Sequence, residues 1–290
     1  MQNITLIMDY GSGDLAFAEI KNQIRLKAGD FVTFDEVPIE SFDGRQAGFV
    51  LNQLAVVPSD SLFFVNVAPR KGYELDRDNK GEDLLYVELK NSNKIITTNS
   101  MYILTYLKDE IVSIHKLKVS DDKSQFRSRD FFSYVAGKFV TSMNRHQIHF
   151  EKLKEHFIDE ENLFDTERDT LRCLREEIGY EEIAKGKIAI KSLYVDSFGN
   201  IKTTIRRSHF EKLGIDLSKK CTVNLEDRNG KVLAKDVLFN ESLFSVDEGK
   251  YTIYFGSSGF EDQFLEIALR SGNAFESLNK IKDYVLNFNK

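Results

Sequence analysis

Residues 4–24 read ITLIMDYGSGDLAFAEIKNQI. The apolar run Ile4–Met8 predicts a buried strand. Tyr10–Gly13 provides turn residues, with glycines that tolerate positive φ. The stretch after Asp14 places apolar residues on one helical face, so a helix is expected there. A strand, a glycine turn and a helix gather ligand-binding groups at the carboxyl end of an α/β sheet. Asp9 and Asp14, on either side of the turn, are therefore candidate ligand-binding carboxylates.

Composition narrows the class of protein. Of the 290 residues, 41% are hydrophobic and 30% charged, which is typical of a globular chain and not of a disordered one. The net charge is −6 and no basic stripe occurs, so nucleic acid is not expected as a partner. No apolar run is long enough for a membrane helix, and the opening residues lack signal-peptide features, so neither a membrane span nor a signal peptide is expected. The two cysteines, Cys173 and Cys221, fit a reducing cytoplasm.

The first half of the chain alternates between strand-like and helix-like stretches. Strands are expected at Ser61–Ala68, Leu84–Leu89 and Lys94–Thr98, and helices at Gly44–Leu54 and Arg129–Met143. This alternation predicts an α/β domain with a mostly parallel sheet and helices on its faces.

The character of the sequence then changes twice. Residues 146–187 are dense in charge and predict a surface helix or a connecting segment. Short alternating strands with turn signals follow, and they predict a small antiparallel β-barrel. We therefore expect two domains, an α/β domain over residues 1–185 that includes the charged connector, and a barrel domain over residues 186–290.

Two stretches together carry a family signature. The first is the opening Asp9-Tyr10-Gly11 followed by Asp14, and the second is DSFGNIKTTI at residues 196–205. SSG at 257–259, LEIA at 265–268 and FDGRQAGFVL at 42–51 support them. In order and spacing, these stretches resemble the S-adenosylmethionine (SAM) hydroxide adenosyltransferases, the family that also contains the SAM-dependent fluorinase and chlorinase. The resemblance extends over nearly the whole chain.

The resemblance implies a fold, an assembly and a reaction. An α/β N-terminal domain and a C-terminal β-barrel would form a homotrimer, with SAM between the N-domain of one subunit and the C-domain of its neighbour. The nucleophile would displace methionine from C5′ of the ribose in an SN2 reaction. Hydrolases of this family use water or hydroxide and release adenosine, whereas halogenases use a halide. SAM would be the substrate or ligand, and no separate cofactor is expected.

The resemblance also implies roles for the two opening aspartates. Asp9 would accept hydrogen bonds from the ribose 2′- and 3′-hydroxyls, which charge assistance strengthens. Asp14 would lie near the methionine amino group. Asp9 as an ordinary turn residue and Asp14 as the N-cap of the following helix are the structural alternatives, and for Asp14 both roles can coexist.

The barrel domain would supply the remaining contacts. Asn200 would orient the nucleoside and Phe198 would lie beside the adenine, although Gly-Asn is also ordinary hairpin-turn chemistry. The Ser257 and Ser258 turn would bind the methionine carboxylate. The backbone around Ser271 and Asn273 would contact the adenine edge.

The chain departs from the family at the water-activating positions. Where the hydrolases have an aspartate, an arginine and a histidine, this chain has Ala68, Leu75 and Arg127. A general base contributes roughly 10²–10⁴-fold, and neither alanine nor a permanently charged arginine can supply one. Two hypotheses follow: a hydrolase that relies on positioning and desolvation of water, or a catalytically degenerate SAM- or adenosine-binding protein.

A halogenase is a weaker alternative. Ser128 stands where the fluorinase has a serine in its halide pocket. The fluorinase's tyrosine and threonine partners would fall at Ala68 and Lys71, and neither matches. A metal site is not expected, because His146 and His149 lack further ligands at a recognisable spacing.

Overall fold

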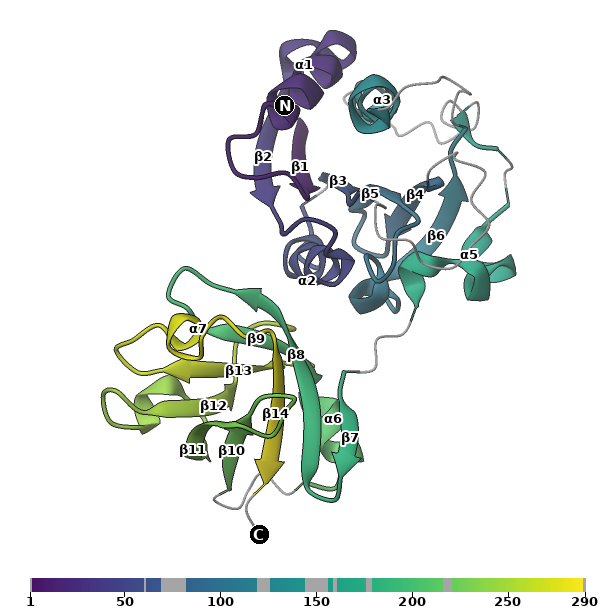
Figure 1. The fold of residues 1–290 in the computed structure, drawn as a ribbon. Helices are drawn as coiled ribbons and strands as arrows, with labels where there is room; N and C mark the ends of the chain where they lie inside the picture. The colour runs from purple at the N-terminus through teal and green to yellow at the C-terminus, as the bar shows by residue number, and fades with distance from the viewer. Residues whose placement is uncertain are drawn as a thin grey trace. The chain divides into compact units, whose positions relative to one another are not determined.

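The computed structural model (Figure 1) describes residues 2–59, 61–68, 82–118, 126–143, 156–158, 161–175, 179–215 and 221–288. The chain forms two compact units, residues 1–176 and residues 177–290. No helix in the described part of the chain is both long and apolar enough to cross a membrane.

The first unit is built on a six-stranded sheet with the order β2-β1-β3-β5-β4-β6. The neighbouring strands β2, β1, β3 and β5 run parallel, and β4 pairs antiparallel with both β5 and β6. This arrangement confirms the expected α/β fold with a mostly parallel sheet. The strands are β1 (Gln2–Met8), β2 (Val32–Pro38), β3 (Leu62–Asn66), β4 (Leu84–Leu89), β5 (Lys94–Thr98) and β6 (Ile111–Lys116).

Helices lie on both faces of this sheet, with α1 and α3 together on one face and α2 on the other (Figure 1). Phe17 and Ile20 of α1 join Phe139 and Val140 of α3 in one buried cluster. The β1 members of this cluster are Ile4, Leu6 and Met8. The segment expected as one helix from residue 129 begins instead with a π-helical turn, η3. The helices are α1 (Leu15–Ala28), η1 (Gly29–Phe31), α2 (Gly44–Ala55), η2 (Thr105–Leu107), η3 (Ser128–Phe132) and α3 (Ser133–Met143).

Residues 161–175 of the charge-dense segment form short helical turns within the first unit, whereas its described residues from 179 onward belong to the second unit. The turns are α5 (Leu163–Thr166), η5 (Arg168–Thr170) and η6 (Arg172–Leu174). The Cys173 side chain is fully buried, and burial raises the pKa of its thiol to about 12. A thiol with such a pKa is a poor nucleophile at neutral pH.

The second unit is a closed barrel. The sheet order is β14-β10-β11-β12-β13-β9-β8-β7, and an additional pairing of β14 with β8 closes seven of these strands into a ring. The expected β-barrel is therefore confirmed, and β7 adds to β8 outside the ring. The strands are β7 (Glu181–Ala184), β8 (Lys187–Val195), β9 (Ile201–Arg206), β10 (Thr222–Glu226), β11 (Val232–Phe239), β12 (Tyr251–Phe255), β13 (Phe264–Leu269) and β14 (Asp283–Phe288).

The described part of the barrel unit also contains three short helical elements, which are α6 (Arg207–Lys212), η7 (Leu243–Ser245) and α7 (Ala274–Ser277). His209 of α6 accepts a hydrogen bond from the Arg206 N–H through Nδ1 and meets the Tyr180 ring edge-on. Burial, and after it the nearby positive charge of Arg206, lowers the pKa of His209 to about 4.

This histidine predicts a pH dependence of stability. The folded-state pKa of His209 lies below the unfolded value of roughly 6.5, so the unfolded chain binds the proton more readily between the two values. Stability is therefore complete above the unfolded pKa and falls as the pH drops from there toward about 4. The melting temperature measured between pH 7 and pH 4.5 should fall less steeply for His209→Gln than for the natural protein. If the melting temperatures of the two proteins fell equally with pH, His209 would not be the source of the pH dependence.

Candidate functional site

The carboxylate of Asp9 lies directly after β1 and is buried, with 6% of the residue exposed. Its Oδ2 accepts hydrogen bonds from the backbone N–H groups of Phe42 and Ala68, both at 3.0 Å. Phe42 follows β2 and has a positive φ of 67°, an uncommon conformation that recurs at functional sites. One carboxylate therefore holds two connections of the sheet in place.

The second oxygen of Asp9 has no such compensation. Oδ1 is buried, and the described residues provide no hydrogen-bond donor for it. Buried polar atoms almost always have a partner, and an unpaired carboxylate oxygen costs more than a neutral one. A ligand that donates a hydrogen bond, such as a hydroxyl group, would satisfy this atom.

A polar cluster adjoins Asp9 at the ends of β1 and β3. The Asn66 carbonyl accepts from the Asp9 N–H at 3.3 Å, and its side-chain amide donates to the Tyr10 hydroxyl at 3.3 Å. The Tyr10 hydroxyl donates to Ser128 Oγ at 3.4 Å. Asn66 and Ser128 are both buried. The structure thus places the predicted Ser128 near Asp9, together with Tyr10 and Asn66, which sequence reasoning missed.

Two of the family's water-activating positions fall on described residues, and Leu75 lies outside them. Ala68 contributes only its backbone N–H to Asp9. Arg127 donates from Nη1 to the Glu82 carbonyl at 3.3 Å and lies 5.2 Å from the centre of the Phe132 ring. Burial lowers the pKa of Arg127, although the guanidinium of arginine stays protonated in proteins near neutral pH. It cannot act as the base that the family's histidine provides.

Three loops of the barrel unit carry the other predicted residues, and two of them pack together. Gly199 has φ +80°, and a Cβ there would lie 2.1 Å from Asn273 Oδ1, so only glycine allows this approach. The Gly199 carbonyl also accepts from the Phe275 N–H at 3.1 Å. Asn273 caps α7 by accepting from the Glu276 N–H, and Ser271 precedes it with φ 60°.

The loop from Asp196 to Asn200 is organised by the Asp196 carboxylate. Oδ1 accepts from the backbone N–H groups of Phe198 and Asn200, at 3.0 and 2.9 Å. Oδ2 accepts from the Asn200 side-chain amide at 3.0 Å. The Phe198 ring is 75% exposed at the tip of the loop. The Asn200 amide is thus held in one orientation, while the Phe198 side chain is exposed.

The serine turn between β12 and β13 is the third of these loops. Ser257 is exposed and Ser258 is buried, with the Ser258 carbonyl accepting from the Phe264 N–H at 2.9 Å. Gly256 at the start of the turn lies directly against the Glu266 side chain. A Cβ added to Gly256 would be only 1.9 Å from Glu266 Oε1, so a larger residue would not fit. This contact joins the serine turn to the LEIA strand.

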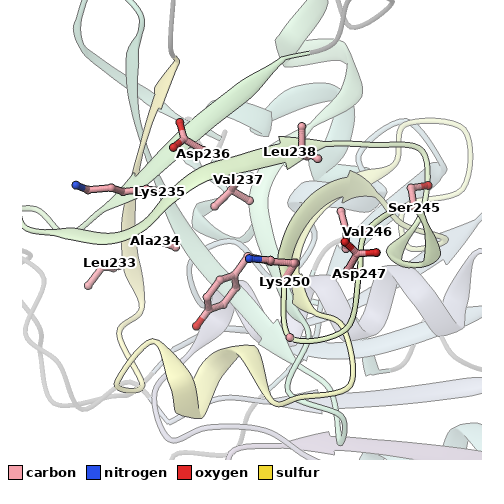
Figure 2. Close-up of a pocket in the computed structure, with 12 residues that line it drawn as sticks. Leu233, Ala234, Lys235, Asp236, Val237, Leu238, Ser245, Val246, Asp247 and Lys250 are labelled. Atoms are coloured by element: carbon pink, nitrogen blue, oxygen red, sulfur yellow. The ribbon is translucent and has the colours of Figure 1, made fainter.

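The barrel also has a pocket that the sequence did not predict (Figure 2). It has a volume of about 670 Å³ and lies between β11 and the segment that leads into β12. Its lining combines lysines and aspartates with apolar residues: Leu233, Ala234, Lys235, Asp236, Val237, Leu238, Ser245, Val246, Asp247, Gly249, Lys250 and Tyr251. None of the predicted site residues lines this pocket. Across the described residues, no cluster of three or more His, Cys, Asp or Glu side chains could hold a metal ion.

The fold and the Asp9 carboxylate define a two-domain protein, with an α/β unit that presents a buried hydrogen-bond acceptor and a closed barrel. Family models identify it further. The SAM hydroxide adenosyltransferase N-terminal domain matches residues 4–149, and the C-terminal domain of the same family matches residues 191–282. The chain therefore belongs to the SAM hydroxide adenosyltransferase family. Membership supports SAM as the ligand and adenosyl transfer as the general class of activity.

Solved structures share the fold over the full length of the chain. An uncharacterized conserved protein from Thermotoga maritima is 19% identical with a TM-score of 0.69, and 99% of this chain and 100% of that chain are covered. A conserved hypothetical protein from Thermus thermophilus is 18% identical with a TM-score of 0.61, and both chains are covered completely. No curated protein matches the sequence.

The hydrogen bond of the Asp14 side chain is made within α1 and not with the polar cluster around Asp9. This side chain is the N-cap of α1 and accepts from the Ala16 N–H at 2.8 Å. The residue is otherwise exposed, so a second role in binding a ligand's amino group stays a prediction.

The two roles of Asp14 can be separated by substitution. Asp14→Ala removes the cap and should lower the unfolding free energy by about 1 kcal/mol, whereas Asp14→Asn keeps a good cap. If Asp14 also pairs with the ammonium of SAM, Asp14→Asn should bind SAM more weakly at unchanged stability. Denaturant unfolding and calorimetric titration measure the two effects. Unchanged SAM affinity in Asp14→Asn would leave the cap as its role.

Proposed function

We propose that the protein binds SAM and hydrolyses it to adenosine and L-methionine. The observation that carries this proposal is the Asp9 carboxylate, with one oxygen anchored by two backbone N–H groups and the other buried without a donor among the described residues. A ribose hydroxyl is a donor of the required kind. In a SAM hydroxide adenosyltransferase, the ligand that brings such a ribose is SAM.

The proposed reaction is a single displacement. The oxygen of water forms a bond to C5′ of the ribose while the bond from C5′ to sulfur breaks. The bonding pair returns to sulfur, so methionine leaves as a neutral thioether, and the water loses a proton to solvent. Because the sulfonium is a good leaving group, positioning the water and excluding bulk solvent are the contributions required of the protein.

The predicted contacts of the barrel fit this ligand. The exposed Phe198 ring offers a face for adenine, and Asp196 orients the Asn200 amide beside it. Ser257 and Ser258 provide hydroxyl and backbone donors for the methionine carboxylate, and the backbone at Ser271 and Asn273 would contact the adenine edge. The proposal retains the homotrimer, with SAM between subunits, as the arrangement that the family resemblance implies.

A binding protein without catalysis is the second candidate function. Arg127 favours it, because a protonated guanidinium held by the Glu82 carbonyl cannot take a proton from water. Ala68 likewise offers no carboxylate. In this case the chain would keep the ribose contact of Asp9 and lack the chemistry.

Asp9→Ala tests the ribose contact. The variant loses charge-assisted hydrogen bonds to the ligand and should bind adenosine about 100-fold more weakly in a calorimetric titration. Asp43→Ala is the matched control, because the Asp43 carboxylate also accepts two backbone N–H bonds, from Arg45 and Gln46, as the N-cap of α2. The control should keep the adenosine affinity. Equal affinities of Asp9→Ala and the natural protein would refute the assignment.

Product analysis separates the two candidate functions. The protein is incubated with SAM, with and without chloride, and adenosine, methionine and 5′-chloro-adenosine are measured by mass spectrometry. Restoring the family's groups with Ala68→Asp, Leu75→Arg and Arg127→His should raise adenosine formation by roughly 10²-fold if their loss limits the rate. Binding of SAM without any product would favour the binding protein, and 5′-chloro-adenosine would favour the halogenase.

A further inference from the structure

A lysine faces a glutamate across two strands of the barrel. Lys202 on β9 is the register partner of Glu266 on β13, and Glu266 is the partner of Tyr254 on β12. The chain neighbours Ile201 and Ile267 belong to the barrel core. Because side chains alternate along a strand, Lys202, Glu266 and Tyr254 lie together on the outer face.

These charged side chains are buried although they lie on the outer face. Lys202 is 8% exposed and Glu266 is 4% exposed. The Lys202 ammonium lies 2.7 Å from Asp196 Oδ2 and 3.1 Å from Glu266 Oε2. Tyr254 donates its hydroxyl to the same Glu266 oxygen at 3.1 Å. One ammonium thus compensates two carboxylates, and its removal would leave both without their cation.

Each carboxylate contacts a different loop of the proposed binding site, Asp196 from within its own loop and Glu266 from strand β13. Asp196 holds the backbone of Phe198 and Asn200 and the Asn200 side chain. Burial alone would raise the pKa of Asp196, but hydrogen bonds from Lys202 and from the Asn200 N–H outweigh it and keep the pKa below its usual value. The carboxylate therefore stays ionised and keeps the loop ordered at neutral pH.

Glu266 contacts the other loop. Its Oε1 lies so close to the Gly256 backbone that no Cβ could be added there. Gly256 leads directly into Ser257 and Ser258. The position of the serine turn therefore depends on where the Glu266 carboxylate is held.

We propose that Lys202 is a positioning residue, whose buried ammonium joins Asp196 to Glu266 and so sets the Asp196–Asn200 loop relative to the Gly256–Ser258 turn. The inference rests on the proposed function, in which these two loops bind the nucleoside and methionine parts of one ligand. Lys202 itself does not contact the ligand. It acts by keeping the two loops at a fixed separation before binding, which lowers the ordering cost of association.

Lys202→Met tests this proposal, since methionine keeps most of the side-chain length and removes the charge. The matched control is Lys187→Met, because Lys187 pairs with the buried Glu226 at 2.9 Å in the same barrel and contacts neither loop. Affinity for SAM is measured by calorimetric titration and the melting temperature by calorimetry. Lys202→Met should bind SAM at least tenfold more weakly, while Lys187→Met stays within twofold of the natural protein, although both lower the melting temperature.

A second variant keeps the test decisive if Lys202→Met does not fold. Tyr254→Phe removes one hydrogen bond to Glu266 at nearly constant volume and should weaken SAM binding about threefold. Unchanged affinity in the folded variants, or an equal loss in Lys187→Met, would overturn the positioning role while the proposed function stands. Absence of SAM binding by the natural protein would overturn the proposed function and this inference with it.

Discussion

The buried carboxylate of Asp9 is the constraint on which the proposed ligand-binding edge of the α/β unit depends. A charge at this depth must be compensated, and the backbone N–H groups of Phe42 and Ala68 compensate one of its oxygens. These donors come from the connections after β2 and β3, so both connections are held at the end of β1. The other oxygen has no donor among the described residues, and a ligand that donates hydrogen bonds would satisfy it.

The requirement that a buried charge be compensated also organises the loops of the barrel. Asp196 belongs to the loop after β8, Glu266 belongs to β13 and lies against the turn at Gly256, and the Lys202 ammonium between these carboxylates pairs with both. Such a network is costly to disturb, because each buried charge depends on the others. Gly199 and Gly256 provide the room that the close packing of these loops requires.

Local sequence patterns predicted helices and strands well where apolar periodicity or a capping residue alone determines the secondary structure. The helix expected at Gly44–Leu54 spans Gly44–Ala55, and the strand expected at Leu84–Leu89 has these bounds. Apolar periodicity and capping residues act over a few positions and can be read directly. The π-helical turn Ser128–Phe132 was not predicted, because it differs from an α-helix only in its hydrogen-bond register.

The sequence by itself determined the two-domain fold, the family and the segments that carry candidate site residues, since hydrophobic patterns and short motifs are local properties of the chain. Only the tertiary structure decided which side chains meet. The pairing of Lys202 with Glu266 joins residues that are 64 positions apart, and the contact of Tyr10 with Ser128 joins residues 118 apart. Such pairs depend on strand register and on how loops pack, which no single stretch of sequence encodes.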